Sequence, residues 1–193
     1  MPLDTSITNV GEYFSSHYLD STFTKDVKDF IDRWNEVGSQ SPPRKLQSLA
    51  QIYFRAKAQA IDEEEPVRRN LTGDLVQGWH ATLLDALGYH DLTPLDIPVE
   101  GAETHVPALG RVNRYNQPWL VICQAHFCLP DGSLKTGRPS EEPLSMSPVK
   151  DDLVTQSDHK LCDGDWARLA GRVLTEEDAP RWLMLLAGSS VLL

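Results

Sequence analysis

The sequence predicts an α/β (α+β) fold, in which an N-terminal helical segment, residues 1–70, precedes a mixed β-sheet flanked by helices, residues 71–193. Two observations predict this division. In the first third, apolar residues recur every three or four positions, as they do on one face of a helix. In the remainder, helical patterns alternate with short extended runs that proline and glycine interrupt. A chain of 193 residues can bury a core of its own without disulfides or a structural metal.

Two helices are expected in the N-terminal segment. Thr24 is a suitable N-cap for the first helix, and Gly38 ends it. The second helix begins at Ser41, because the prolines that follow fit a first helical turn. The apolar residues of the two helices are Val27, Phe30, Ile31, Trp34 and Val37, and then Leu46, Leu49, Ala50 and Tyr53. The aromatic residues that lead into the first helix are interpreted as packing residues: Tyr13, Phe14, Tyr18 and Phe23.

The sheet domain is expected to open with a helix that Thr72 caps and Gly88 ends. A second helix begins at Asp163 or Asp165. The apolar face of that helix comprises Trp166, Leu169, Ala170 and Val173. The extended segments expected around the two helices are residues 95–100, 105–112, 119–127, 181–187 and 191–193. The proline-rich stretch 130–160 is so long a connection that it is either functional or poorly ordered.

The predicted order is a helix, three antiparallel strands, a crossover helix and a further strand, which gives a layered mixed sheet. In the third strand, one face changes from apolar at Leu120 and Ile122 to polar at Gln124 and His126. A strand that leaves the core to line a cleft would show this change. The element order resembles the common core of the PD-(D/E)xK nucleases, the restriction-endonuclease-like fold. That family carries Glu-x-Lys on the third strand, and the matching triplet here runs from Gln124 to His126.

In that family, carboxylates hold Mg²⁺ and the lysine orients or activates water. Gln124 is a neutral ligand that binds Mg²⁺ poorly, and His126 could act as a general base but carries no charge at neutral pH. The upstream carboxylates are Glu100 and Glu103, with Asp96 on the first strand. The resemblance thus implies a degenerate nuclease site at these positions, from which we expect no catalysis. Gln124 and His126 are then polar residues at a strand end, hydrogen-bonded to their neighbours.

A zinc site is the weaker alternative. His126 and Cys128 share a strand face, and His159 precedes Cys162 by three residues, so all four are ligand types that zinc accepts. Their spacing matches no usual zinc motif, and free cysteines are commonly small buried hydrophobes. We therefore expect no metal centre. The odd count of three cysteines and the lack of an export signal favour reduced thiols in the cytoplasm.

The net charge is −10, and residues 71–193 hold 9 basic against 17 acidic side chains. Such a surface repels phosphates, which makes the segment a poor candidate for a stand-alone, non-specific nucleic-acid binder. A local basic patch remains compatible with this balance, at Arg111 with Arg114 or at Arg68 with Arg69. No P-loop, dinucleotide-binding or nucleophile-elbow motif occurs, and no apolar run is long enough to cross a bilayer.

Three stretches together carry a family resemblance: residues 9–19 (NVGEYFSSHYL), 84–89 (LDALGY) and 179–193 (APRWLMLLAGSSVLL). They resemble the N-terminal region of large adenine-specific DNA methyltransferases of the type IIG restriction–modification kind, which include bacterial phage-defence methylases. The resemblance implies a PD-(D/E)xK-like domain, then a helical connector and a methylase that uses S-adenosylmethionine. The methylase signature Asn-Pro-Pro-Tyr/Phe and its glycine-rich cofactor loop do not occur here. The methylase part is therefore expected beyond Leu193 or on another chain.

We accordingly expect a non-catalytic N-terminal domain of a restriction–modification-type DNA methyltransferase that defends against foreign DNA. The alternatives are a divergent Mg²⁺-dependent DNA endonuclease and an acidic adaptor that docks a basic protein. No cofactor is expected in this segment, and S-adenosylmethionine would serve the intact protein. The expected partners are DNA, through the intact protein, and proteins of a defence system, with no membrane. The apolar strand that reaches Leu193 also suggests a segment of a longer protein.

Overall fold

The computed structural model describes residues 15–62, 69–98, 104–128, 143–145, 160–161 and 164–193. The chain forms two compact units, Met1–Ser48 and Leu49–Leu193, which are described separately. The division follows Ser48, whereas the sequence pattern predicts a boundary at residue 70. Most of the stretch 130–160 lies outside the described residues, as do Tyr13 and Phe14.

The first unit is helical. Its elements are the π-helix η1 (Tyr18–Thr22), α1 (Phe23–Asp26), α2 (Lys28–Val37), the 3₁₀ helix η2 (Gly38–Gln40) and α3 (Pro42–Ser48). Thr24 lies inside α1 and is therefore not an N-cap. The N-cap of α2 is Val27, whose side chain makes no capping hydrogen bond. Gly38 ends α2 with φ of +64°, as its position predicts. The expected apolar face of α2 is largely exposed, from Trp34 at 39% to Val37 at 56%.

The second unit opens with α4 (Ala50–Asp62) and α5 (Arg69–Leu87), which contact each other. The rings of Tyr53 and Trp79 pack between them at a tilt of 51°, with centroids 5.3 Å apart. Because α4 packs on α5, it belongs to the second unit, and the boundary between the two units lies before α4. α5 starts at Arg69, so Thr72 lies within the helix and is not its N-cap. Gly88 ends α5 as predicted, with φ of +91° and the paired backbone bonds of a Schellman turn.

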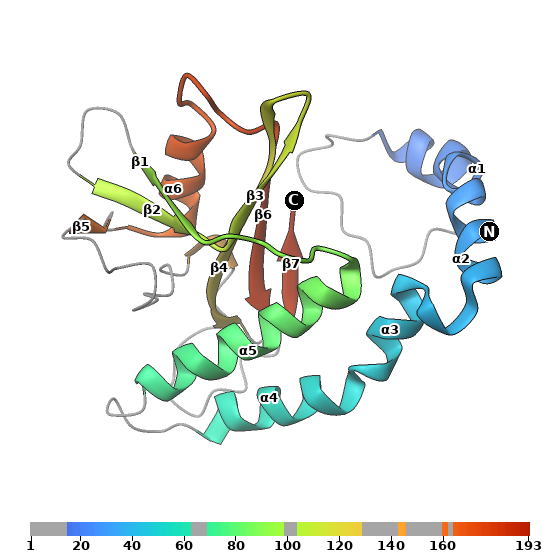
Figure 1. The fold of residues 1–193 in the computed structure, drawn as a ribbon, viewed down its shortest axis with the longest axis horizontal. Helices are drawn as coiled ribbons and strands as arrows, with labels where there is room; N and C mark the ends of the chain where they lie inside the picture. The colour runs from blue at the N-terminus through green and yellow to red at the C-terminus, as the bar shows by residue number, and fades with distance from the viewer. Residues whose placement is uncertain (1–14, 63–68, 99–103, 129–142, 146–159, 162–163) are drawn as a thin grey trace. The chain divides into compact units, whose positions relative to one another are not determined.

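Within the described residues, seven strands follow α5, and Figure 1 shows their arrangement. They are β1 (Leu95–Pro98), β2 (Thr104–Ala108), β3 (Gly110–Arg114), β4 (Gln117–Cys128), β5 (Lys160–Leu161), β6 (Trp182–Gly188) and β7 (Ser190–Leu192). One sheet has the order β3-β4-β6-β7 and the other has the order β1-β2-β5. The pairs β1–β2, β3–β4 and β6–β7 are antiparallel, whereas β4–β6 and β2–β5 are parallel. The expected mixed sheet is confirmed.

The single strand expected at 105–112 is divided into β2 and β3 at Leu109. The first half pairs with β1, and the second half pairs with β4. Gly110 sits so tightly against Leu92 that a Cβ there would approach the Leu92 Cβ to 2.8 Å. The chain bends at Leu109 and passes from one sheet to the other, and the glycine that follows leaves room for Leu92. Periodicity alone does not reveal this change of sheet.

The crossover helix α6 (Trp166–Val173) joins the parallel strands β4 and β6. Asp165 is its N-cap, because its Oδ1 accepts the Arg168 backbone N–H at 2.9 Å. The side chains of Trp166, Leu169 and Val173 are fully buried and form one core with Val121, Cys123, Ala125, Leu185 and Ala187. The predicted helix start and apolar face are both confirmed. Among the described residues, no helix combines the length and apolar character that crossing a membrane requires.

Candidate functional site

The degenerate nuclease position Gln124 lies on β4, on the face opposite the α6 core. On β4, Val121, Cys123 and Ala125 pack in the α6 core, whereas Gln124 contacts His80 of α5. The two helices therefore cover opposite faces of β4, and α5 also contacts β6 (Figure 1). Gln124 is only 5% exposed. The expectation that this face opens into a cleft at Gln124 is wrong, because α5 covers the residue.

His80 is fully buried and makes two hydrogen bonds that determine its tautomer. The Gly188 backbone N–H donates to Nε2 of His80 at 2.9 Å, so this nitrogen carries the lone pair. Nδ1 of His80 then holds the proton and donates it to Oε1 of Gln124 at 3.2 Å. Next to His80, Trp79 donates its indole N–H to the Gly188 carbonyl oxygen at 2.9 Å. Two consecutive helix residues thus bind both backbone polar groups of Gly188.

Burial lowers the pKa of His80 from 6.5 to about 4, and the hydrogen bond with Gln124 opposes this shift in part. The imidazole is therefore neutral at physiological pH. Both of its nitrogens are engaged, and solvent does not reach it. His80 is thus a structural group that closes α5 onto the sheet, and it has no free lone pair for a substrate proton.

The other predicted site residues are placed only in part. His126 and Cys128 belong to β4, whose register with β6 shifts between Gln124 and Cys128. Their side chains lie outside the described part of the structure, as do the residues Glu100, Glu103, His159 and Cys162. Asp96 lies on β1 opposite Pro107 and is half-buried. Within the described residues, no group of three or more His, Cys, Asp or Glu residues could hold a metal ion.

Cys123, the described free cysteine, lies in the α6 core. Complete burial raises the pKa of its thiol well above the usual range. The thiolate is therefore disfavoured, and Cys123 serves as a small apolar core residue.

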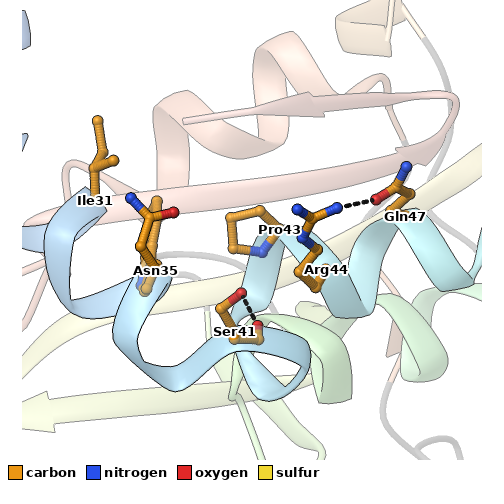
Figure 2. Close-up of a pocket in the computed structure, with 8 residues that line it drawn as sticks. Ile31, Asn35, Ser41, Pro43, Arg44 and Gln47 are labelled. Atoms are coloured by element: carbon orange, nitrogen blue, oxygen red, sulfur yellow. Dashed lines mark hydrogen bonds between the residues drawn. The ribbon is translucent and has the colours of Figure 1, made fainter.

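A pocket of about 460 Å³ lies in the first unit, between α2 and α3 (Figure 2). Its described lining is Ile31, Trp34, Asn35, Gly38, Ser41, Pro43, Arg44 and Gln47. The polar groups bind each other: Ser41 donates to the Gly38 carbonyl at 2.6 Å, and Arg44 donates to Gln47 at 3.1 Å. This lining contains no carboxylate, imidazole or thiol, so it offers no group for acid–base or metal chemistry.

Sequence reasoning missed two features. His80 gave no signal, because its partners lie 44 and 108 residues away in the chain. The second feature is a cluster of arginines and aromatic rings at the β3–β4 hairpin, and the predicted basic patch covered only its Arg114. The alternative basic patch, Arg68 with Arg69, is not described: Arg68 and the side chain of Arg69 lie outside the described part of the structure.

Comparisons of the chain with protein-family models, curated proteins and solved structures gave no match. The functional argument therefore depends on the geometry of this chain.

Proposed function

We propose that this chain is a non-catalytic, nuclease-like N-terminal domain of a restriction–modification-type DNA adenine methyltransferase. In this role the domain positions DNA for a methylase module that acts in defence against foreign DNA. The element order supports the proposal: α5 precedes an antiparallel run of strands, and α6 crosses over to place β6 parallel to β4. The sequence of this chain lacks the glycine-rich cofactor loop. S-adenosylmethionine would therefore bind to the methylase module and not to this domain.

The observation that carries the proposal is the state of Gln124. It lies on β4, the strand that the sequence pattern predicts as the third, at the position where the nuclease motif has a carboxylate, yet it is a neutral amide. Its Oε1 accepts the buried proton of His80 at 3.2 Å. If Gln124 turned to ligate Mg²⁺, that imidazole N–H would lose its acceptor, at a cost of about 1–3 kcal/mol. Mg²⁺ prefers carboxylate oxygens, and an amide oxygen returns little of this free energy.

Two experiments test the two halves of the proposal. The chain is first incubated with supercoiled plasmid in Mg²⁺ or Mn²⁺, and no nicking is expected. Cleavage that disappears in Glu103→Ala or His126→Ala would instead support the divergent endonuclease.

The second experiment uses the complete product of the gene and labelled S-adenosylmethionine. We expect methyl transfer to adenine in unmethylated DNA. Deletion of residues 1–193 should raise the KM for DNA and change kcat little, because positioning acts on binding. A gene product that transfers no methyl group to DNA would refute the methyltransferase assignment.

A further inference from the structure

The tip of the β3–β4 hairpin gathers arginines around an indole ring. The Arg114 guanidinium carbon lies 4.9 Å from the centroid of the Trp119 ring, and that of Arg181 lies 5.2 Å from it. Arg114 also lies 5.4 Å from the ring centroid of Tyr115. We call these four residues, Arg114, Tyr115, Trp119 and Arg181, the hairpin surface.

The register of the sheet explains why the four side chains meet. The β3–β4 pairing shifts after Val112, which leaves Trp119 as an extra residue on β4. The parallel pairing of Leu120 with Trp182 then brings the preceding residues, Trp119 and Arg181, side by side. Trp119 thus contacts two arginines, Arg114 at the end of β3 and Arg181 directly before β6.

Tyr115 is held where few large residues occur. Tyr115 and Asn116 have φ values of +52° and +62°, which is the pattern of a type I′ turn. Glycine or asparagine usually fills the first of these positions, because a Cβ is disfavoured there. The Tyr115 side chain is 88% exposed, so packing within the described fold does not explain it. An exposed aromatic ring on a strained turn is a feature that a ligand contact would explain.

The charges of the hairpin surface are available to a ligand. Arg114 and Arg181 are exposed, and within the described part of the chain neither pairs with a carboxylate. The contact with the Trp119 ring restrains both guanidinium groups, which keep N–H donors for an anion. Glu177 and Asp178 are exposed shortly before Arg181 in the sequence. Their charge opposes an anionic ligand, so binding should depend strongly on salt.

We propose that the hairpin surface binds single-stranded DNA, with Arg114 and Arg181 on phosphates and Tyr115 stacked on a base. A ring stacks only on a base that is unpaired, which favours a single strand over an intact duplex. An acidic peptide would use the arginines but would leave the exposed ring without a function. The proposal deepens the proposed function, on which it rests for the choice of DNA over RNA.

The test is fluorescence anisotropy of a labelled oligothymidine of about 16 nucleotides, titrated with the full chain at low ionic strength. We expect saturable binding. Tyr115→Asn should weaken it about tenfold, since it removes one stacked base contact. Arg114→Gln and Arg181→Gln should each weaken it and reduce the slope of log Kd against log salt by about 0.7. The control Arg168→Gln removes an equal charge from an exposed position of α6 and should change the Kd little.

Several results would overturn the proposal. The unaltered chain could fail to bind, all variants could bind equally well, or Arg168→Gln could lose as much affinity as the variants of the hairpin surface. Tighter binding of oligouridine than of oligothymidine, or competition by polyglutamate as effective as that by oligothymidine, would also overturn it. Unfolding does not imitate the expected result, because asparagine suits the turn and Tyr115→Asn should unfold at no lower temperature. Oligothymidine binding is also independent of methyl transfer. A gene product without methylase activity would refute the proposed function but not DNA binding by the hairpin surface. Absent oligothymidine binding would refute DNA binding by the hairpin surface but not the proposed function.

Discussion

The buried His80 should make the stability of the second unit depend on pH in a way that one substitution removes. The perturbation is His80→Gln. A glutamine offers an amide oxygen to the Gly188 N–H, but its NH2 group sits on a flexible side chain that no ring directs toward the Gln124 Oε1. At pH 7 the weakening of this buried bond should lower the free energy of unfolding by about 1 kcal/mol.

The pH dependence has a definite sign. The pKa of His80 is about 4 in the folded protein against an ordinary value of 6.5. Between these values the unfolded chain binds a proton that the folded chain does not, so stability falls as the pH falls. The contribution of neutral His80 is fully present above pH 6.5 and is lost as the pH falls through about 4. A difference of roughly 2.5 pKa units corresponds to about 3 kcal/mol.

The assay is urea unfolding of the native protein and the variant from pH 7 to pH 4, followed by tryptophan fluorescence. The remaining histidines and the carboxylates titrate in both proteins, so the difference between the two curves isolates His80. The native protein should be the more stable at pH 7, and the difference should move in favour of the variant by most of the expected 3 kcal/mol as the pH approaches about 4. Parallel curves over this range would refute the assignment of a neutral, buried His80.

Three further substitutions and one labelling experiment test local features of the fold by urea unfolding or by reaction with a thiol reagent. Gly110→Ala should destabilise by about 1–3 kcal/mol, because its Cβ would meet Leu92 at 2.8 Å. Gly78→Ala, where nothing lies within 4 Å, should instead stabilise α5 by up to about 1 kcal/mol; equal effects at the two glycines would contradict the close approach at Gly110. Asp165→Ala should cost about 1 kcal/mol through the lost N-cap of α6, and an unchanged urea midpoint would argue against that cap. Cys123 should react with a thiol reagent only after unfolding, and rapid labelling of Cys123 in the native protein would contradict its burial.

Local chemistry made α6 and the ends of two helices predictable. Asp165 followed by apolar residues at helical spacing specifies both the start of α6 and its buried face. Gly38 and Gly88 adopt the positive φ that ends a helix. These features depend on residues within one or two turns of each other, so a sequence pattern contains the information.

Features that depend on distant contacts were not predictable. The close packing at Gly110 involves Leu92, and the buried Gln124 is covered by α5, which carries His80. The apolar spacing of α2 indicated a buried face, yet Val37 and its neighbours are exposed, because periodicity does not say what covers a helix. The candidate site could be placed on β4 from the sequence, but not its covering by α5.

The bonds from Trp79 and His80 to Gly188 join residues 109 and 108 positions apart. During synthesis α5 leaves the ribosome long before β6 exists, so the polar groups of both side chains remain hydrated at first. Docking of this helix therefore has to wait for strand β6, and closing so long a loop is slow. In a nascent chain halted before Trp182, the indole of Trp79 and the imidazole of His80 should remain accessible to solvent. The helix α5 should then be open to capture by chaperones.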